Sequence, residues 1–172
     1  TPPEVSFNDL ATLAAHVCDT PIALVTFVDG DREWFKARTG MSIEAVPREV
    51  SFSAHAILQS DVFVVTDAST DARFAANPLV TETHLRFCAG APITNRDGYS
   101  LGTICVMDRM PRELTASQFQ GLRALARHAV HLLELRRAML REVATRPAEE
   151  LLHEITQGTA AVTGTRFFTS LV

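Results

Sequence analysis

The sequence of 172 residues contains no long apolar run. Runs such as IALVTFV, residues 22–28, fall far short of the roughly 18 residues that a membrane-spanning helix needs. No basic segment followed by an apolar one opens the chain, and its first residue is Thr1 rather than Met. We therefore expect a piece of a longer protein, with no membrane insertion by this segment and with any targeting signal outside it.

The chain also lacks an excess of basic residues. Its net charge is −4, and its densest basic stretch, residues 133–142, is interleaved with Glu134 and Glu142. Such a stretch is typical of a solvated helix face rather than of a phosphate-binding surface. We therefore expect no nucleic-acid partner.

Cysteine is scarce, and no glycine-rich phosphate loop is present. Cys18, Cys88 and Cys105 show neither a CxxC motif nor Cys/His spacing. This excludes a disulfide framework and a zinc site as the basis of the fold, so no metal site is expected. A reducing, cytoplasmic location is the simplest expectation.

What the chain does contain is a succession of short periodic segments. Apolar residues at helical spacing predict a helix over residues 6–18, capped by Ser6 or Asn8 and ended before Pro21. Residues 22–28 and 32–39 are predicted strands joined by a turn at Asp29–Asp31. Within the second strand, alternation places Trp34, Lys36 and Arg38 on one face and Phe35 and Ala37 on the other.

The middle of the chain continues this pattern. Ser51 is expected to cap a short helix over residues 52–60, followed by a strand over 62–67 and a long loop that contains DARFAANPLV, residues 71–80. Residues 86–94 and 100–108 read as a hairpin. This order predicts an α+β architecture, an antiparallel sheet with helices on its faces.

From Thr115 onward the apolar period becomes helical, and Thr115 with Gln118 forms a capping box. One apolar stripe comprises Phe119, Leu122, Ala126, Ala129, Leu133, Leu140 and Val143, and a second comprises Leu125, Leu132 and Met139. A helix packed only on its own domain explains the first half of this stripe. The continuation to Val143 favours self-association. Pro147 interrupts the helix.

These segments together resemble a GAF domain. The resemblance covers residues 5–140 and is carried by SFSAHAIL, VFVVTDASTDARFAANPLV, RFCAGAPI and GYSLGTICVMDRMPREL. The branch is the one found at the N-terminus of bacterial sensor histidine kinases and diguanylate cyclases. It implies a six-stranded antiparallel sheet with the N- and C-terminal helices on one face. Loops and short helices on the other face would enclose a pocket.

The resemblance also implies a division of the chain and a role for each part. Residues 1–112 would form the GAF core, residues 113–146 a long signalling and dimerisation helix, and residues 147–172 a linker and the start of a following module. The implied function is regulatory rather than catalytic: a sensory module of a two-component or related signalling protein. It would act as a homodimer upstream of an output domain such as a kinase or cyclase.

The resemblance assigns residues to three groups, with no catalytic residue among them. The expected ligand pocket comprises Phe52, His55, Phe74, Leu79, Phe87, Cys88, Cys105 and Met107, with an unknown small molecule as its possible guest. A lid over the pocket is expected to be shaped by Asp71, Arg73, Asn77 and Pro78 and anchored by Phe74, Leu79 and Val80. The expected dimer helix uses Phe119, Leu122, Leu125, Leu132, Leu133, Met139 and Leu140.

The sequence departs from relatives of this branch at two positions. Ser53 stands where they often have cysteine, and Cys88 where they often have an aromatic residue. No cysteine is followed directly by a histidine, so no covalent bilin is expected. The Asn-Lys…Phe…Asp-Glu signature of cyclic-nucleotide-binding members is also missing. Two alternatives stay open: a thiol-dependent enzyme like the GAF-fold methionine sulfoxide reductases, and a structural domain whose pocket is collapsed.

Overall fold

The structure is a computed structural model, and it describes residues 5–145. The predicted linker and following module, residues 147–172, lie outside the described residues. The elements in chain order are α1 (Val5–Cys18), β1 (Ile22–Val28), β2 (Arg32–Thr39), β3 (Ala45–Pro47), the 3-10 turn η1 (Arg48–Val50), α2 (Phe52–Ala56), β4 (Phe63–Val65), α3 (Pro78–Thr81), β5 (Phe87–Thr94), β6 (Ser100–Asp108) and α4 (Ala116–Thr145).

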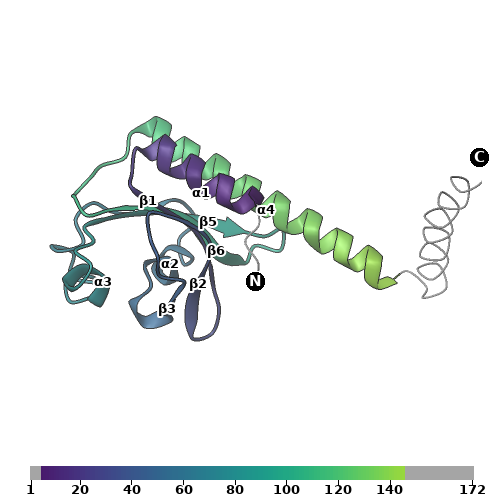
Figure 1. Cartoon of the computed structure of the whole chain (residues 1–172), viewed down its shortest axis with the longest axis horizontal. Helices are drawn as coiled ribbons and strands as arrows, with labels where there is room; N and C mark the ends of the chain where they lie inside the picture. The colour runs from purple at the N-terminus through teal and green to yellow at the C-terminus, as the bar shows by residue number, and fades with distance from the viewer. Residues whose placement is uncertain (1–4, 146–172) are drawn as a thin grey trace, which may run out of the picture. The chain divides into compact units, whose positions relative to one another are not determined.

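The strands form one six-stranded antiparallel sheet in the order β3-β2-β1-β6-β5-β4. This confirms the predicted α+β fold class. As Figure 1 shows, α1 and the first half of α4 lie on one face of the sheet, and α2 and α3 lie on the other. Strand β3 was not predicted from the residues, because three residues are too few to show an alternating pattern.

Helix α1 buries one face against the sheet through Phe7, Leu10 and Ala14 at the predicted helical spacing. Among the described residues it already begins at Val5, so the prediction that Ser6 or Asn8 caps it is wrong. Asp19 follows the helix in the left-handed region, with φ of 52°, and breaks the helical path before Pro21.

Helix α4 begins with the predicted capping box. The amide of Gln118 donates to Oγ1 of Thr115 (3.2 Å), and the amide of Thr115 donates to Oε1 of Gln118 (3.0 Å). Leu122 and Ala129 are fully buried. A Cβ at Gly121 would meet the side chain of Val17, so α1 and α4 approach closely at this point. The chain divides into two compact units, residues 1–132 and 133–172, with α4 running across the division.

Strand β2 contains a bulge that changes which side chains share a face. Ala37 pairs with Val25 and Phe35 pairs with Thr26, which leaves Lys36 as the extra residue. Beyond the bulge, Arg38 pairs with Leu24, whereas Trp34 pairs with Phe27, three residues further along β1. Directly paired residues share a face and successive residues alternate, so the prediction that Arg38 shares a face with Trp34 is wrong.

Candidate functional site

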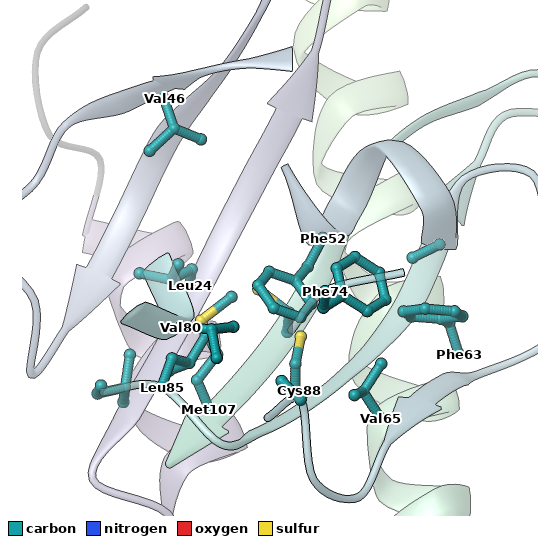
Figure 2. Close-up of a cluster of buried hydrophobic side chains, with 14 of the residues drawn as sticks. Leu24, Val46, Phe52, Phe63, Val65, Phe74, Val80, Leu85, Cys88 and Met107 are labelled. Atoms are coloured by element: carbon teal, nitrogen blue, oxygen red, sulfur yellow. The ribbon is translucent and has the colours of Figure 1, made fainter. Parts of the chain in front are cut away.

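The sheet face under α2 and α3 is the expected pocket face, and apolar side chains fill it. Figure 2 shows two gatherings of side chains on this face, one around Phe52 and Phe74 and one around Leu24, Leu85 and Met107. The buried cluster consists of Ile22, Leu24, Phe35, Val46, Phe52, Ala56, Phe63, Val65, Ala68, Phe74, Val80, Leu85, Cys88, Cys105 and Met107. Its members occupy the space in which the family resemblance implied a pocket.

The ring of Phe74 is the centre of the aromatic part of this cluster. It stacks on Phe52 with centroids 4.3 Å apart, and the ring of His55 meets it edge-on at 4.8 Å. Phe74 is 1% exposed although it belongs to a loop. Phe74 thus anchors the loop to the buried cluster.

The lid loop takes its shape from contacts within itself. Arg73 donates to Asp71 through Nε (2.9 Å) and Nη2 (2.7 Å), and the backbone amide of Arg73 donates to the same carboxylate (2.9 Å). The guanidinium carbon of Arg73 also lies 5.1 Å from the ring centroids of Phe63 and Phe74. The Arg73 side chain, through its hydrogen bonds, holds the pKa of Asp71 below its ordinary value.

Asn77 joins the lid to the rest of the domain. Its Oδ1 accepts from the amide of Leu79 (2.9 Å) and so caps α3, while its Nδ2 donates to the carbonyl of Val50 (2.9 Å). Pro78 follows at the first helical position, where a missing amide costs nothing. Asn77 therefore fixes both the turn of the chain and its distance from η1.

The structure brings most of the expected pocket residues together. Phe52, Phe74, Cys88, Cys105 and Met107 belong to the buried cluster, and Leu79 packs against it. His55 is half-buried at its edge, beside a surface hollow lined by Asp31, Pro47, Arg48, Glu49, Ala54 and Leu58. Phe87 is buried but lies outside the cluster. It precedes Cys88 in β5, so its side chain points to the opposite face of the sheet.

A polar network that was not predicted lies beneath α2. Glu33 is 2% exposed, and its carboxylate accepts from Ser51 Oγ on Oε2 (2.6 Å) and from Ser53 Oγ on Oε1 (2.6 Å). Ser53 is in turn 2.9 Å from the hydroxyl of Thr103 and 3.1 Å from that of Thr26. The network links strands β1, β2 and β6 to the start of α2.

Burial sets the electrostatics of this network and of the nearby cysteines. Burial raises the pKa of Glu33, and the hydroxyls of Ser51 and Ser53 oppose the shift by hydrogen bonding to the charged form. Burial also raises the pKa of Cys88 and Cys105, which are 2% and 1% exposed, and raises that of Cys18 to about 11. All three cysteines are free thiols. Such thiols are protonated and shielded, so they are poor nucleophiles.

The expected dimer residues divide between two environments along α4. Leu122 and Leu125 are buried in the domain, and Phe119, Leu132 and Leu133 are half-buried. The apolar side chains nearer the end of α4 are exposed: Leu135, Met139, Leu140 and Val143 are between 57% and 65% accessible.

Among the residues that the structure describes, no group of three His, Cys, Asp or Glu side chains could hold a metal ion. Over the same residues, every helix is too short or too polar to span a bilayer.

The sheet order, the two helical layers and the loop over the sheet define an α+β domain built on one central antiparallel sheet. The GAF domain family matches residues 2–133, so the chain belongs to that family. The cyclic di-GMP phosphodiesterase PA2567 of Pseudomonas aeruginosa is 46% identical over 107 residues, which are 62% of this chain and 18% of that protein. The chain therefore spans less than a fifth of this relative.

Solved structures resemble the fold at low sequence identity. A domain of a putative two-component sensor histidine kinase from Sinorhizobium meliloti has a TM-score of 0.63 at 11% identity, covering 80% of this chain and 94% of that one. The free methionine-R-sulfoxide reductase of Neisseria meningitidis also scores 0.63, at 15% identity, covering 77% and 78%. At such identities the likeness concerns the fold alone.

Proposed function

We propose that the chain is a non-catalytic regulatory module that pairs with a second copy of itself through the distal half of α4 and relays signals to an output domain. The observation that carries this proposal is the exposed apolar stripe of Leu135, Met139, Leu140 and Val143. These residues span two turns on one side of the helix, and a contiguous exposed apolar surface of this kind is typical of a contact with another helix.

Helix α1 supplies a smaller surface of the same kind. Leu13 and Val17 are 51% and 40% exposed and lie one helical turn apart. Val17 also adjoins Gly121 of α4. A dimer that uses both terminal helices would cover these side chains together with the distal stripe.

The space under the lid loop is filled by side chains, which supports a role in relaying a signal rather than in holding a ligand in this conformation. The Phe52–Phe74 stack occupies the space under the lid, so a guest could enter only if Phe74 moved outward with its loop. We propose that binding of a small molecule, where it occurs, acts by this displacement of the lid. A cytoplasmic location fits the three free thiols.

The alternative of a thiol-dependent reductase is less well supported. Such an enzyme needs an accessible thiolate with a resolving thiol within reach. The burial of Cys88 and Cys105 and their raised pKa values oppose both requirements.

The dimer is tested by charge substitutions on the distal part of α4. Met139→Glu and Leu140→Glu place carboxylates in the apolar stripe and are expected to convert a dimer to a monomer, measured by sedimentation equilibrium of the full chain. The matched control is Ala138→Glu, which introduces the same side chain at an exposed position of the same helix, outside the stripe. A wild-type chain that stays monomeric at high micromolar concentration would contradict the proposal.

A further inference from the structure

Strand β4 forms one edge of the sheet and is three residues long. It pairs with β5, from Phe63 opposite Gly90 to Val65 opposite Cys88. So short a ladder holds a strand weakly, and contacts outside the ladder therefore matter for its position. These contacts reach the lid loop, residues 71–80, and also α4. The end of the lid loop, in α3, and helix α4 lie on opposite faces of the sheet (Figure 1).

The lid loop rests on the first residue of β4. Phe63 is 6% exposed, and its ring meets that of Phe74 edge-on with centroids 6.1 Å apart. The guanidinium of Arg73 lies over both rings, and Arg73 lines a surface hollow together with residues 59–64. An outward movement of the lid would therefore remove two partners from Phe63.

The start of β4 is bound to α4 by an ion pair. Asp61, two residues before the strand, accepts from Nε (2.7 Å) and Nη2 (2.6 Å) of Arg123 in α4. Its Oδ1 also accepts from the amide of Val62 (2.7 Å), which orients the carboxylate. A bidentate pair is the geometry in which an exposed ion pair contributes most. The hydrogen bonds from Arg123 lower the pKa of Asp61 to about 2, so the carboxylate is charged at neutral pH.

The other end of β4 is bonded to the segment that leads into α4. The carbonyl of Thr66, directly after the strand, accepts from the amide of Arg112 (3.1 Å). Arg112 belongs to the connection between β6 and α4, and its Nε donates to Asp108 at the end of β6 (2.5 Å). Both ends of the edge strand are therefore attached to α4 or to its leading segment, while its first side chain packs under the lid.

We propose that β4 couples the lid loop to α4, with Asp61 and Arg123 as the positioning residues of this coupling. The inference rests on the lid displacement proposed above and adds the route by which it reaches the helix. When the lid moves outward, Phe63 loses its partners, the short strand shifts, and the ion pair with α4 loosens. Because coupling is reciprocal, breaking the ion pair must also loosen the lid.

Hydrogen–deuterium exchange of the full chain, followed by mass spectrometry, tests the coupling from the α4 side. Arg123→Gln and Asp61→Asn are expected to speed amide exchange of the lid loop about threefold relative to β1. Strand β1 lies inside the sheet and serves as the reference for unfolding of the whole domain. The double variant is expected to be no faster than either single variant, because all three lack the same pair.

Two matched controls remove the same charge elsewhere. Arg127→Gln changes an exposed residue one turn further along α4. Arg32→Gln breaks an exposed ion pair with Asp29 on β2, which three strands separate from β4. Both controls are expected to leave exchange of the lid loop, relative to β1, as in the wild type.

The coupling is tested from the lid side with Arg73→Gln, which removes the guanidinium from the rings of Phe63 and Phe74. Exchange in the first turns of α4, residues 116–126, is expected to rise about threefold relative to β1. In an Arg123→Gln background the same substitution should have no further effect on α4, because the ion pair is already absent.

Three outcomes would overturn the inference: unchanged lid exchange in Arg123→Gln, equal acceleration of the lid and β1, or an Arg73→Gln effect on α4 that is the same in both backgrounds. The substituted residues are exposed, so the variants are expected to fold. The readout lies within one domain and does not require a dimer. A monomeric wild type would therefore contradict the proposed dimer alone, and unchanged lid exchange in a dimeric chain would contradict this coupling alone.

Discussion

Glu33 stands in the alternating pattern of β2 at the position before Trp34, yet it is more deeply buried than any other acidic side chain in the described part of the chain. Two serine hydroxyls donate to it at 2.6 Å, which keeps the buried carboxyl hydrogen-bonded in either protonation state. Ser51 also caps α2 by accepting from the amide of Ala54 (2.9 Å). The protonation of Glu33 is therefore coupled to the start of α2.

The raised pKa of Glu33 sets the sign of its pH effect. The folded state holds the Glu33 proton more tightly than the unfolded chain does. The contribution to stability is therefore complete below the ordinary glutamate pKa and declines as pH rises through the raised value. Glu33→Gln should flatten this decline, so the stability of the variant should rise relative to that of the wild type as the pH increases above the ordinary glutamate pKa.

Urea unfolding at several pH values measures this difference. Asp61 and Asp71, whose pKa values are lowered, act in the opposite direction but are unchanged in the comparison. Glu82→Gln, at an exposed position, serves as the control and should run parallel to the wild type. Parallel profiles for Glu33→Gln as well would show that Glu33 is ionised in the folded state without penalty.

At the scale of elements, the strands β1 and β6 are held unusually close at Gly102. A Cβ at this position would lie on the carbonyl oxygen of Thr26, and backbone cannot move aside as a flexible side chain can. Gly102→Ala should therefore destabilise the domain by about 3 kcal/mol or more, measured by urea unfolding. Gly30→Ala, where no atom lies within 4 Å of the added Cβ, should stay within about 1 kcal/mol of the wild type. Equal stabilities of the two variants would contradict this.

The elements also show how far the sequence predicts the fold. The α4 capping box and the β5–β6 hairpin were predictable because their signals lie within a few consecutive residues. The β2 bulge was not, because it depends on how β1 pairs with β2. The same limit applies to the site: the alternation that places Phe35 on the pocket face also places Glu33 there, but its hydroxyl partners come from other segments.

For the whole molecule, the core and the exposed stripe are separable. Every buried apolar residue of the described part lies at or before Ala129, whereas the exposed stripe begins at Leu135. A chain that ends at Leu132 should therefore unfold cooperatively within a few degrees of the full chain, yet remain monomeric where the full chain dimerises. Thermal unfolding by circular dichroism and sedimentation of both chains test this. A truncated chain that unfolds at room temperature, or that dimerises equally well, would contradict it.

The contact between Val17 and Gly121 has a mechanical consequence. Helices α1 and α4 are in contact on the same side of the sheet. A rotation of α4 about its own axis would therefore displace α1 through this contact. The strands need not bend for that motion to travel from one helix to the other. A bulkier residue at position 121 would increase the distance between α1 and α4. It would thereby weaken the coupling between the two helices without changing the opposite face of the sheet.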